Sequence, residues 1–308
     1  MSTNESNQVR VPLFRMLLGK AWVHAVLVAL SFLMVLPFVW MVMTSLKSGG
    51  EVESGGFVPA KKTIVDEETG ATSERRFLVE NYSHVNDHEN PNPNKRGVQY
   101  ARSYWNSIYV GAWITFLQVV TSSMAAYSFA RLKWRGRDTI FLMYLGTMML
   151  PGLVMMIPNY EIMIQLGLVD TLIGLILPAS FGAFGTFLLR QFMLSIPASL
   201  DEAAEIDGCS KWQIFSDIIL PLARPGLITL TIFTFIGTYN SFFWPLIMLK
   251  QEANYTLPIS LMFFDSTRGQ STHLLMAAVT MSIVPMVILF VALQKYLVKG
   301  IQIGAVKG

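Results

Sequence analysis

Cysteine and charge are both scarce in this sequence of 308 residues. A single cysteine, Cys209, is present. One cysteine cannot form an internal disulfide framework or a cysteine-based metal cluster. Only 14% of the residues are charged and 53% are hydrophobic, whereas about a quarter of the residues in soluble domains are charged. Such a composition excludes an ordinary soluble protein and indicates a lipid bilayer as the solvent.

The few charges leave six long runs of the chain uncharged, with histidine counted as neutral. A helix that crosses about 30 Å of hydrocarbon needs roughly 20 apolar residues, and all six runs reach or nearly reach that length. The first run is too long for the apolar part of a signal peptide, so we expect it to be retained. We therefore predict an all-α, polytopic membrane protein with six transmembrane helices. The runs cover residues 21–46, 103–130, 139–160, 171–189, 225–249 and 269–294.

The Lys and Arg residues between these runs predict the orientation of the chain. Short cytoplasmic loops carry an excess of these residues, whereas long loops cross largely regardless of charge. The two terminal tails, the segment RLKWRGRD and the connection 190–224 together hold thirteen, against two in the short connections of the opposite side. We therefore expect the tail 1–20, the connection 190–224 and the tail 295–308 in the cytoplasm, with both termini on that side.

The long connection 47–102 differs in composition from the rest of the chain. It holds nine acidic and eight basic residues and includes the stretch DHENPNPNKRG, which favours turns over helix. We expect a small, partly irregular extracytoplasmic cap. The alternative is a solvated spacer.

The connection 190–224 contains the acidic stretch SLDEAAEIDG, and its residue spacing predicts a short helix. Ser199 and Glu202 have capping-box spacing, so the helix is expected to begin at Leu200. Asp201 and Glu202 then lie in the first turn, where carboxylates suit the helix dipole. Gly208 is placed to end the helix in a left-handed conformation.

A second short helix is expected directly after Gly208. Ser210 and Gln213 repeat the capping spacing, and Pro221 and Pro225 are expected to break the chain before the next long run. Apolar residues recur at steps of three and four, which predicts one buried face. They are Trp212, Phe215, Ile218 and Ile219.

The charge of the first helix bears on its role. An amphipathic helix that lies on a membrane surface is usually rich in Lys and Arg on its polar face, and such a surface helix pair is the alternative here. The stretch instead carries four carboxylates and no basic residue. Anionic headgroups would repel it and a basic protein surface would attract it, so we predict docking to a cytoplasmic partner.

The stretch EAAEIDGCSKWQIFSDIILPLARP resembles the EAA loop of membrane-spanning permease subunits of binding-protein-dependent ABC importers. Cys209 stands where alanine is usual. Three other stretches, WMVMTSLKS, YWNSIYV and KYLVKGIQIGAVKG, resemble the sugar-importing, maltose-type branch. The resemblance covers the first run and about 101–308, whereas the connection 47–102 is longer than usual. The residues that match the EAA pattern are Glu202, Ala203, Ala204, Asp207, Gly208 and Pro221.

The resemblance implies the type I ABC importer permease fold in the cytoplasmic (inner) membrane. It implies import of a sugar or related polyol together with a second permease, separate ABC ATPase subunits and an extracytoplasmic solute-binding protein. No G-x-x-x-x-G-K phosphate loop occurs in the sequence, so ATP hydrolysis is expected in the ATPase partner. We expect no catalytic residue, cofactor, metal or nucleic-acid partner for this chain. We expect its spans to contact membrane lipid.

In such a transporter the EAA helix fits a groove on the ATPase and moves with it. Glu202 would pair with a basic residue there, and Ala203 and Ala204 would allow close approach. Gly208 would set the angle between the two arms of the loop.

The stretch GTYNSFFWPLIML in the fifth run brings amides, hydroxyls and rings together, as a sugar path requires. Tyr239, Asn240, Ser241 and Trp244 are our candidate pathway residues. Alternatively, Asn240 and Ser241 hydrogen-bond between helices and Trp244 is an interfacial anchor. In the maltose-type system the defined sugar site lies on the partner permease, so an affinity site in this chain is not required.

A secondary transporter or channel for a small polar solute is the competing class. Such proteins commonly place ionisable residues inside the membrane, and no run has a central Asp, Glu, Lys or Arg. A membrane-embedded enzyme is a third class, but the runs contain no HExxH, GxSxG or paired carboxylates.

The predicted orientation can be tested by thiol labelling. In a Cys209→Ala background, we expect a cysteine at Asn92 to react with an impermeant thiol reagent added to intact cells, and one at Gln213 to remain unlabelled. Labelling at Gln213 with protection at Asn92 would reverse the assignment.

Overall fold

The computed structural model describes residues 13–65, 72–85, 99–268 and 272–305. Asn92 and most of the tail 1–20 lie outside these ranges. The chain divides into two compact units, Met1–Asn81 with Thr272–Ala277 and Tyr82–Ser271 with Ala278–Gly308.

The first unit is dominated by α1 (Leu13–Ser45). Its segment Ala21–Ser45 is long and apolar enough to cross a membrane. Every side chain from Ala21 to Trp40 is exposed. An uncharged helix that is exposed on all sides needs lipid rather than water around it, so this helix is a transmembrane span.

The chain after α1 forms α2 (Gly49–Glu53), β1 (Lys62–Val65), β2 (Thr72–Arg75) and the start of α3 (Asn81–His84). The two strands pair antiparallel, with Lys62 opposite Arg75, which the composition of this segment did not predict. The buried Asn81 side chain donates hydrogen bonds to the carbonyl oxygens of Ser45 (2.7 Å) and Lys47 (2.8 Å). It thereby fastens the far end of the segment to the end of α1.

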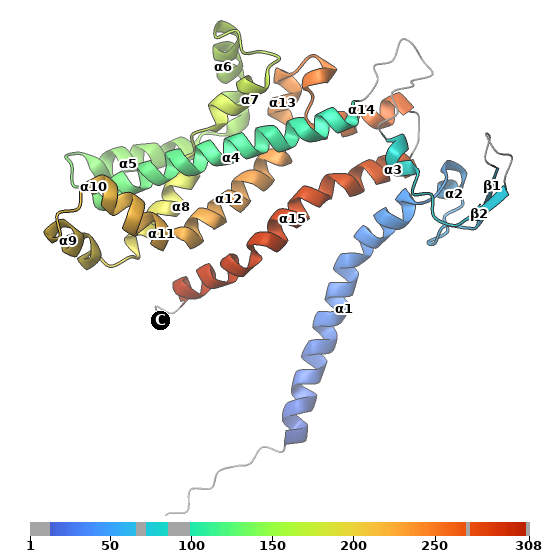
Figure 1. Cartoon of the computed structure of the whole chain (residues 1–308), viewed down its shortest axis with the longest axis horizontal. Helices are drawn as coiled ribbons and strands as arrows, with labels where there is room; N and C mark the ends of the chain where they lie inside the picture. Colours follow the sequence, from blue (N-terminus) through green and yellow to red (C-terminus); the bar gives the residue numbers. More distant parts are fainter. Residues whose placement is uncertain (1–12, 66–71, 86–98, 269–271, 306–308) are drawn as a thin grey trace, which may run out of the picture. The chain divides into compact units, whose positions relative to one another are not determined.

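The second unit is built around α4 (Tyr100–Arg131), which packs against α8 (Ala183–Leu194) and α12 (Arg224–Tyr239) (Figure 1). Small residues let the helices approach closely, as is usual between membrane helices. A Cβ atom built at Gly185 would lie 2.6 Å from Ser122 Oγ, and one at Gly226 would lie 2.7 Å from the ring of Phe192. These positions therefore require glycine.

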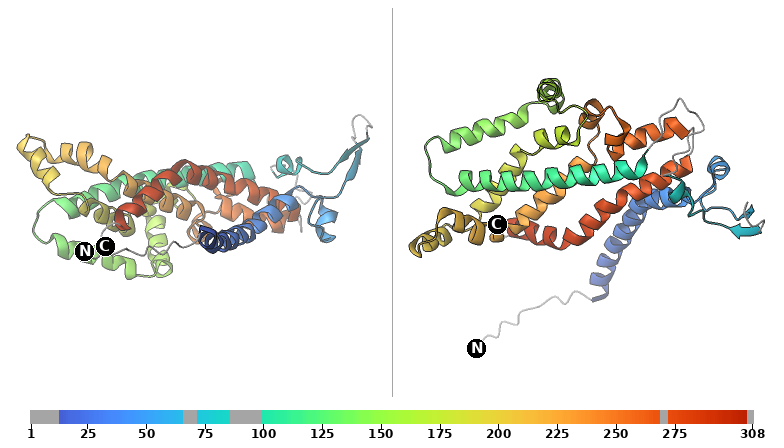
Figure 2. Two further views of the ribbon diagram at one scale, coloured as in Figure 1. Left: turned by 90° about the horizontal axis from the view of Figure 1, so that it is seen from below. Right: turned by 45° about the horizontal axis from the view of Figure 1, so that its top comes forward.

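The end of α4 that begins at Tyr100 is held by polar contacts to the start of α14 (Leu257–Arg268) and to the segment just before it. Asn106 Nδ2 donates to the carbonyl oxygens of Ala253 (3.0 Å) and Tyr255 (2.9 Å). Ser107 Oγ accepts a hydrogen bond from the N–H of Leu257 at 2.7 Å. The views in Figure 2 place α14 at this end of α4 and the segment 199–222 at the other.

The third and fourth predicted runs are broken rather than straight. The third forms α5 (Arg137–Gly146), η1 (Thr147–Met149) and α6 (Gly152–Gln165), with a bend of 99°. Pro151 causes this break, because proline lacks an N–H and disfavours helical geometry at the preceding residue; Leu150 has an extended ψ of 123°. The fourth forms α7 (Leu172–Ala179) and α8, bent by 43°.

The described residues contain three helices long and apolar enough to span a membrane, and three bent pairs that pass the same test as broken spans or re-entrant loops. Together they make up to six spans, which confirms the predicted all-α membrane fold. The last of the three helices is α15 (Thr272–Ala305). The fifth run is interrupted at residues 240–242, between α12 and α13 (Phe243–Met248), so the break precedes Pro245.

Asp170 joins two connections of the second unit. It adopts a left-handed backbone conformation with φ 61°. Its Oδ1 accepts hydrogen bonds from the N–H groups of Lys250 (2.8 Å) and Gln251 (3.0 Å), and Asn254 Nδ2 donates to its carbonyl oxygen at 2.6 Å. Partial burial opposes ionisation of this carboxyl, but the hydrogen bonds outweigh it and hold the pKa of Asp170 below its ordinary value.

The glycine contacts between the helices lead to a stability prediction. Gly185→Ala should destabilise the protein by about 1–3 kcal/mol, because the added methyl group overpacks the contact with Ser122. The matched control is Gly146→Ala, where a Cβ meets nothing within 4 Å and helix propensity favours alanine. Thermal unfolding of both purified variants measures the difference. Equal melting temperatures would contradict the close packing at Gly185.

Candidate functional site

The EAA loop, residues 190–224, forms two short arms joined at Gly208. The first arm is α9 (Ser199–Ile206), with Asp201 and Glu202 in its first turn as predicted. Gly208 has φ +84°, which confirms the left-handed stop. Ser210 and Gln213 form the expected capping box at the start of α10 (Lys211–Gln213).

The prediction is wrong at Ser199 and at Pro221. The residue that precedes α9 is Ala198, with helical φ and ψ and no side-chain cap, so Ser199 does not cap the helix. Pro221 does not break the chain: a π-helix (Ile214–Ile219) leads directly into α11 (Leu220–Leu222). The wider π turn accommodates the proline, whose ring would clash with a carbonyl in a regular α-helix. The chain turns instead at Ala223, by 74° between the flanking helical segments.

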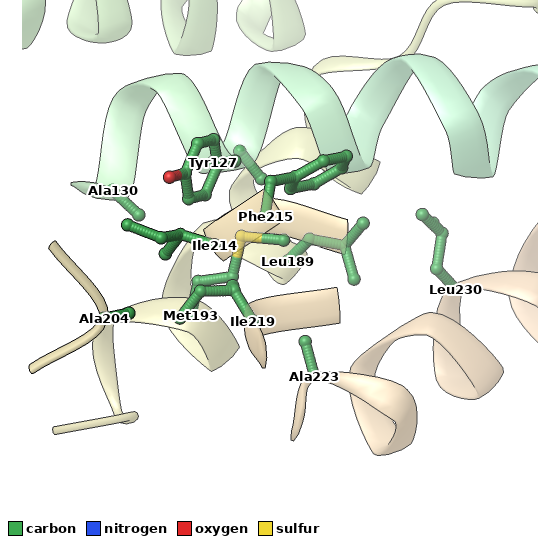
Figure 3. Close-up of a cluster of buried hydrophobic side chains, with 11 residues drawn as sticks. Tyr127, Ala130, Leu189, Met193, Ala204, Ile214, Phe215, Ile219, Ala223 and Leu230 are labelled. Atoms are coloured by element: carbon green, nitrogen blue, oxygen red, sulfur yellow. The ribbon is translucent and has the colours of Figure 1, made fainter. Parts of the chain in front are cut away.

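A cluster of buried apolar side chains fastens the second arm to the helices behind it (Figure 3). Ile214, Phe215 and Ile219 are buried in this cluster. Trp212 was expected on the same face, but it is 62% exposed and lies at the edge of the cluster, against the ring of Phe215. The arm is therefore a packed part of the second unit. The partners on the neighbouring helices are Ala126, Tyr127 and Ala130 of α4, Leu189 and Met193 of α8, and Leu230 of α12.

Arg131, the last residue of α4, ties the first arm to the same helices. Its Nη1 lies 3.0 Å from Asp201 Oδ2, and the two side chains are only 8% and 16% exposed. Its Nη2 donates to the carbonyl oxygens of Met193 (2.6 Å) and Ile196 (2.7 Å). One guanidinium thus joins the end of α4, the end of α8 and the start of α9. In the sequence, Arg131 is only one of the four basic residues of the segment RLKWRGRD.

The two faces of α9 differ sharply. Ala204 is 5% exposed and packs into the buried cluster, so only Ala203 of the alanine pair is exposed. Glu202, Ala203 and Ile206 share the outer face, and Ile206 is 86% exposed. Residues spaced by three and four positions share one side of a helix. The outer face is therefore a small apolar strip with a carboxylate beside it.

The carboxylates of the loop also differ in their partners. Lys211 Nζ forms an ion pair with Glu205 within the loop. Glu202 and Asp207 are exposed and form no ion pair with any residue that the structure describes. They are free to meet a charge from outside.

The candidate pathway residues lie around the break between α12 and α13. Tyr239 is buried, and its hydroxyl donates to the carbonyl oxygen of Ser282 at 3.0 Å. Asn240 Nδ2 donates to the carbonyl oxygen of Ile236, one turn back in its own helix, at 3.0 Å. Ser241 and Trp244 instead line a cavity of about 160 Å³. The structure thus separates the four residues into two pairs.

The cavity brings in residues that sequence reasoning did not select. Ser107 comes from α4, Thr238 from α12 and Thr256 from the position immediately before α14. The remaining lining is apolar and comes from α4, α7, Gly237 of α12 and Pro245. The sequence does carry a signal for Ser107, because Ser or Thr recurs along the apolar helix α4. In the structure five of these residues are buried, at positions 103, 107, 115, 122 and 123.

Across residues 13–65, 72–85, 99–268 and 272–305, no group of three or more His, Cys, Asp or Glu side chains is placed to hold a metal ion.

Comparison with known proteins identifies the family. Residues 118–303 match the binding-protein-dependent transport system inner membrane component family. The chain is 38% identical over 209 residues to the arabinooligosaccharides transport system permease protein AraQ of Halalkalibacterium halodurans, covering 67% of this chain and 75% of the relative. It is 31% identical over 293 residues to a putative ABC transporter permease protein, ORF2, of a Caldicellulosiruptor species, covering 94% and 98%.

Two further similarities agree. The chain is 33% identical over 207 residues to the sn-glycerol-3-phosphate transport system permease protein UgpE of Brucella abortus, covering 67% of this chain and 73% of that protein. A chain from the crystal structure of a bacterial ABC transporter involved in the import of the acidic polysaccharide alginate has the same fold. It superposes with a TM-score of 0.72 and 24% identity, over 96% of this chain and 99% of that one.

The fold and the loop define an integral inner-membrane transport subunit. The chain belongs to the family of binding-protein-dependent transport system inner membrane components, and it is a permease subunit of an ABC importer. This confirms the resemblance and the membrane location predicted from the sequence.

The ion pair behind α9 leads to a prediction about stability. Arg131→Met should destabilise the protein by about 3 kcal/mol, because it leaves the largely buried Asp201 carboxylate without its partner. The control is Lys211→Met, which breaks the exposed pair with Glu205 and should cost little. Thermal unfolding of the two variants in the same detergent measures the difference. An unchanged melting temperature for Arg131→Met would show that Asp201 does not depend on this pair.

Proposed function

We propose that this chain, with a second permease, forms the path by which a sugar or related polyol crosses the cytoplasmic membrane. Separate ABC ATPase subunits supply the energy and an extracytoplasmic binding protein delivers the substrate. The names of the relatives support a carbohydrate or polyol substrate, since they refer to arabinooligosaccharides, sn-glycerol 3-phosphate and alginate. Membership of the family supports the set of partners.

The observation that carries the proposal is the construction of α9. Its inner face is held by the Arg131–Asp201 ion pair and by Ala204 in the buried cluster. Its outer face presents Glu202, Ala203 and Ile206 without covering from the described residues. A helix whose inner face is packed against its own subunit and whose outer face is uncovered can transmit a movement of a docked partner to that subunit, as a coupling element must.

Each matched residue of the EAA pattern then has a role. Glu202 pairs with a basic group on the ATPase, Ala203 permits close approach, and Ala204 holds the helix to its own subunit. The left-handed Gly208 fixes the angle between the arms and leaves Asp207 exposed beside it. Pro221, which follows the π-helix, directs the second arm toward the turn at Ala223.

Nucleotide hydrolysis belongs to the partner in this proposal. The sequence has no G-x-x-x-x-G-K phosphate loop. The Lys and Arg asymmetry supports a cytoplasmic position for the EAA loop and both termini, on the side where a soluble ATPase can dock. A secondary transporter or channel would not need such a docking loop.

The substrate path passes Ser241 and Trp244, which line the cavity between α4, α7 and α12. Tyr239 and Asn240 belong to the same stretch, but the Tyr239 hydroxyl donates to the carbonyl oxygen of Ser282, and Asn240 Nδ2 donates to the carbonyl oxygen of Ile236 and to Met286 Sδ. Their role in the path is to hold the broken end of α12 in place.

The coupling role can be tested by charge reversal at Glu202. Glu202→Arg should cost about 1 kcal/mol or less in local stability, because the residue is exposed in the first turn of α9. It should weaken docking of the ATPase by about 2–5 kcal/mol if Glu202 faces a cation in the interface. The measurement is retention of the ATPase subunit, and its stimulation by loaded binding protein, in the purified complex. Asp217→Arg, an exposed carboxylate on the second arm, is the control.

A second pair of variants tests the joint. Gly208→Val should uncouple ATP hydrolysis from transport, because a β-branched residue is strongly disfavoured at φ +84°. Gly208→Asn should retain coupling, since asparagine tolerates this conformation. A Cβ at this position meets nothing within 4 Å, so a difference between the variants reports backbone conformation and not a clash. Normal stimulation in both Glu202→Arg and Gly208→Val would rule out the EAA loop as the coupling element.

A further inference from the structure

We infer that the 160 Å³ cavity beside Trp244 is a binding subsite for one neutral sugar ring within this subunit. The inference rests on the transport function proposed above and goes beyond it. It places a point of affinity in this chain rather than only in a partner permease, and it states the charge of the substrate.

The size of the cavity suits a single ring. A cavity of about 150 Å³ in a protein interior holds one six-membered aromatic ring, and the cavity here is about 160 Å³. A longer oligosaccharide would therefore place one ring at a time in the subsite.

The lining has the chemistry that a sugar requires. Ser107, Thr238, Ser241 and Thr256 bring hydroxyl groups to the cavity, and Trp244 brings an indole ring. Sugar recognition combines a few placed polar groups with apolar and aromatic surface. The lining provides both.

Two polar atoms of these lining residues lack partners. Thr256 is 4% exposed, and its Oγ1 has no hydrogen-bond partner among the described residues; the same holds for Trp244 Nε1. Buried polar groups in proteins are nearly always paired. Ser107 Oγ accepts the N–H of Leu257, the first residue of α14, and the Thr256 hydroxyl just before it makes no capping hydrogen bond among the described residues. The hydroxyl of Thr256 is thus left without a structural task.

The charge of the lining selects the substrate class. A second cavity of about 340 Å³ adjoins the first and shares Ile114, Ala179, Gly237 and Thr238 with it. It extends the path along α4 to Gln118, whose side-chain oxygen accepts a hydrogen bond from Thr234 at 2.6 Å. Among the described residues that line either cavity, none is charged. A phosphate or carboxylate would find no cation there, so the subsite favours a neutral ring over anionic substrates.

Gly237 offers a way to close the subsite without disturbing the fold. It lines both cavities, and a Cβ at this position meets nothing within 4 Å. Gly237 is exposed, so a leucine side chain at 237 can be accommodated without a clash at its Cβ, and we expect it to occupy the space that the two cavities share. Gly152 is the matched control, because it also has open space around its Cβ and lies on neither cavity.

The test uses the assembled transporter, with its ATPase and second permease, in lipid nanodiscs. Saturation-transfer NMR would compare three neutral rings, D-glucose, D-galactose and L-arabinose, with D-glucuronate, which adds a carboxylate to the glucose ring. We expect saturation transfer to at least one neutral ring and none to glucuronate. Gly237→Leu should abolish the signal, Gly152→Leu should leave it unchanged, and Thr256→Val should weaken binding about three- to tenfold.

Each outcome decides the inference. Binding of glucuronate in place of the neutral rings, binding of none of the probes, or an unchanged signal in Gly237→Leu would overturn it. Stimulation of the ATPase by loaded binding protein, measured on the same samples, reports the proposed function separately. Normal stimulation of the unsubstituted complex with no effect of Gly237→Leu on sugar binding would reject the subsite and leave the permease function standing. Absence of stimulation in the unsubstituted complex would reject the function itself.

Discussion

The guanidinium of Arg131 is the contact on which the candidate site depends. It neutralises Asp201 and at the same time satisfies the carbonyl oxygens of Met193 and Ile196 at the end of α8. Carbonyl groups at a helix end have no partners within the helix, and a carboxylate that leaves water needs a cation. A single side chain meets both requirements. The position of α9 is therefore set by the two helices behind it and not by its own few turns.

The sequence alone identified the parts of the protein that depend on local physics. Charge-free runs revealed the spans, because the energetic requirement of lipid applies to every residue of a crossing helix. The spacing of Ser210 and Gln213 and the glycine at 208 predicted the second cap and the left-handed turn, since both effects act within a few residues. The break at Pro151 could have been read from the same kind of signal, but the bend of 99° could not.

The features that sequence reasoning missed depend on residues far apart in the chain. Arg131 and Asp201 are separated by 70 positions, and the local sequence around either residue does not predict that they pair. The same is true of the cavity, where Ser107 and Thr256 meet only because α4 passes the start of α14. The π-helix before Pro221 is local in the sequence, but three of its residues, Ile214, Phe215 and Ile219, lie in the buried cluster.

The polar contacts at both ends of α4 join the EAA loop to the region of α14 through one continuous helix. Arg131 and Tyr127 bind the EAA loop at one end. At the other end, Asn106 binds the segment before α14 and Ser107 binds the first residue of α14. With 32 residues, the helix is about 48 Å long. A tilt of about 5° about one end would displace the other by about 4 Å, more than the length of a hydrogen bond. Small rotations at the loop would thus become displacements large enough to remake contacts at the opposite end of the subunit.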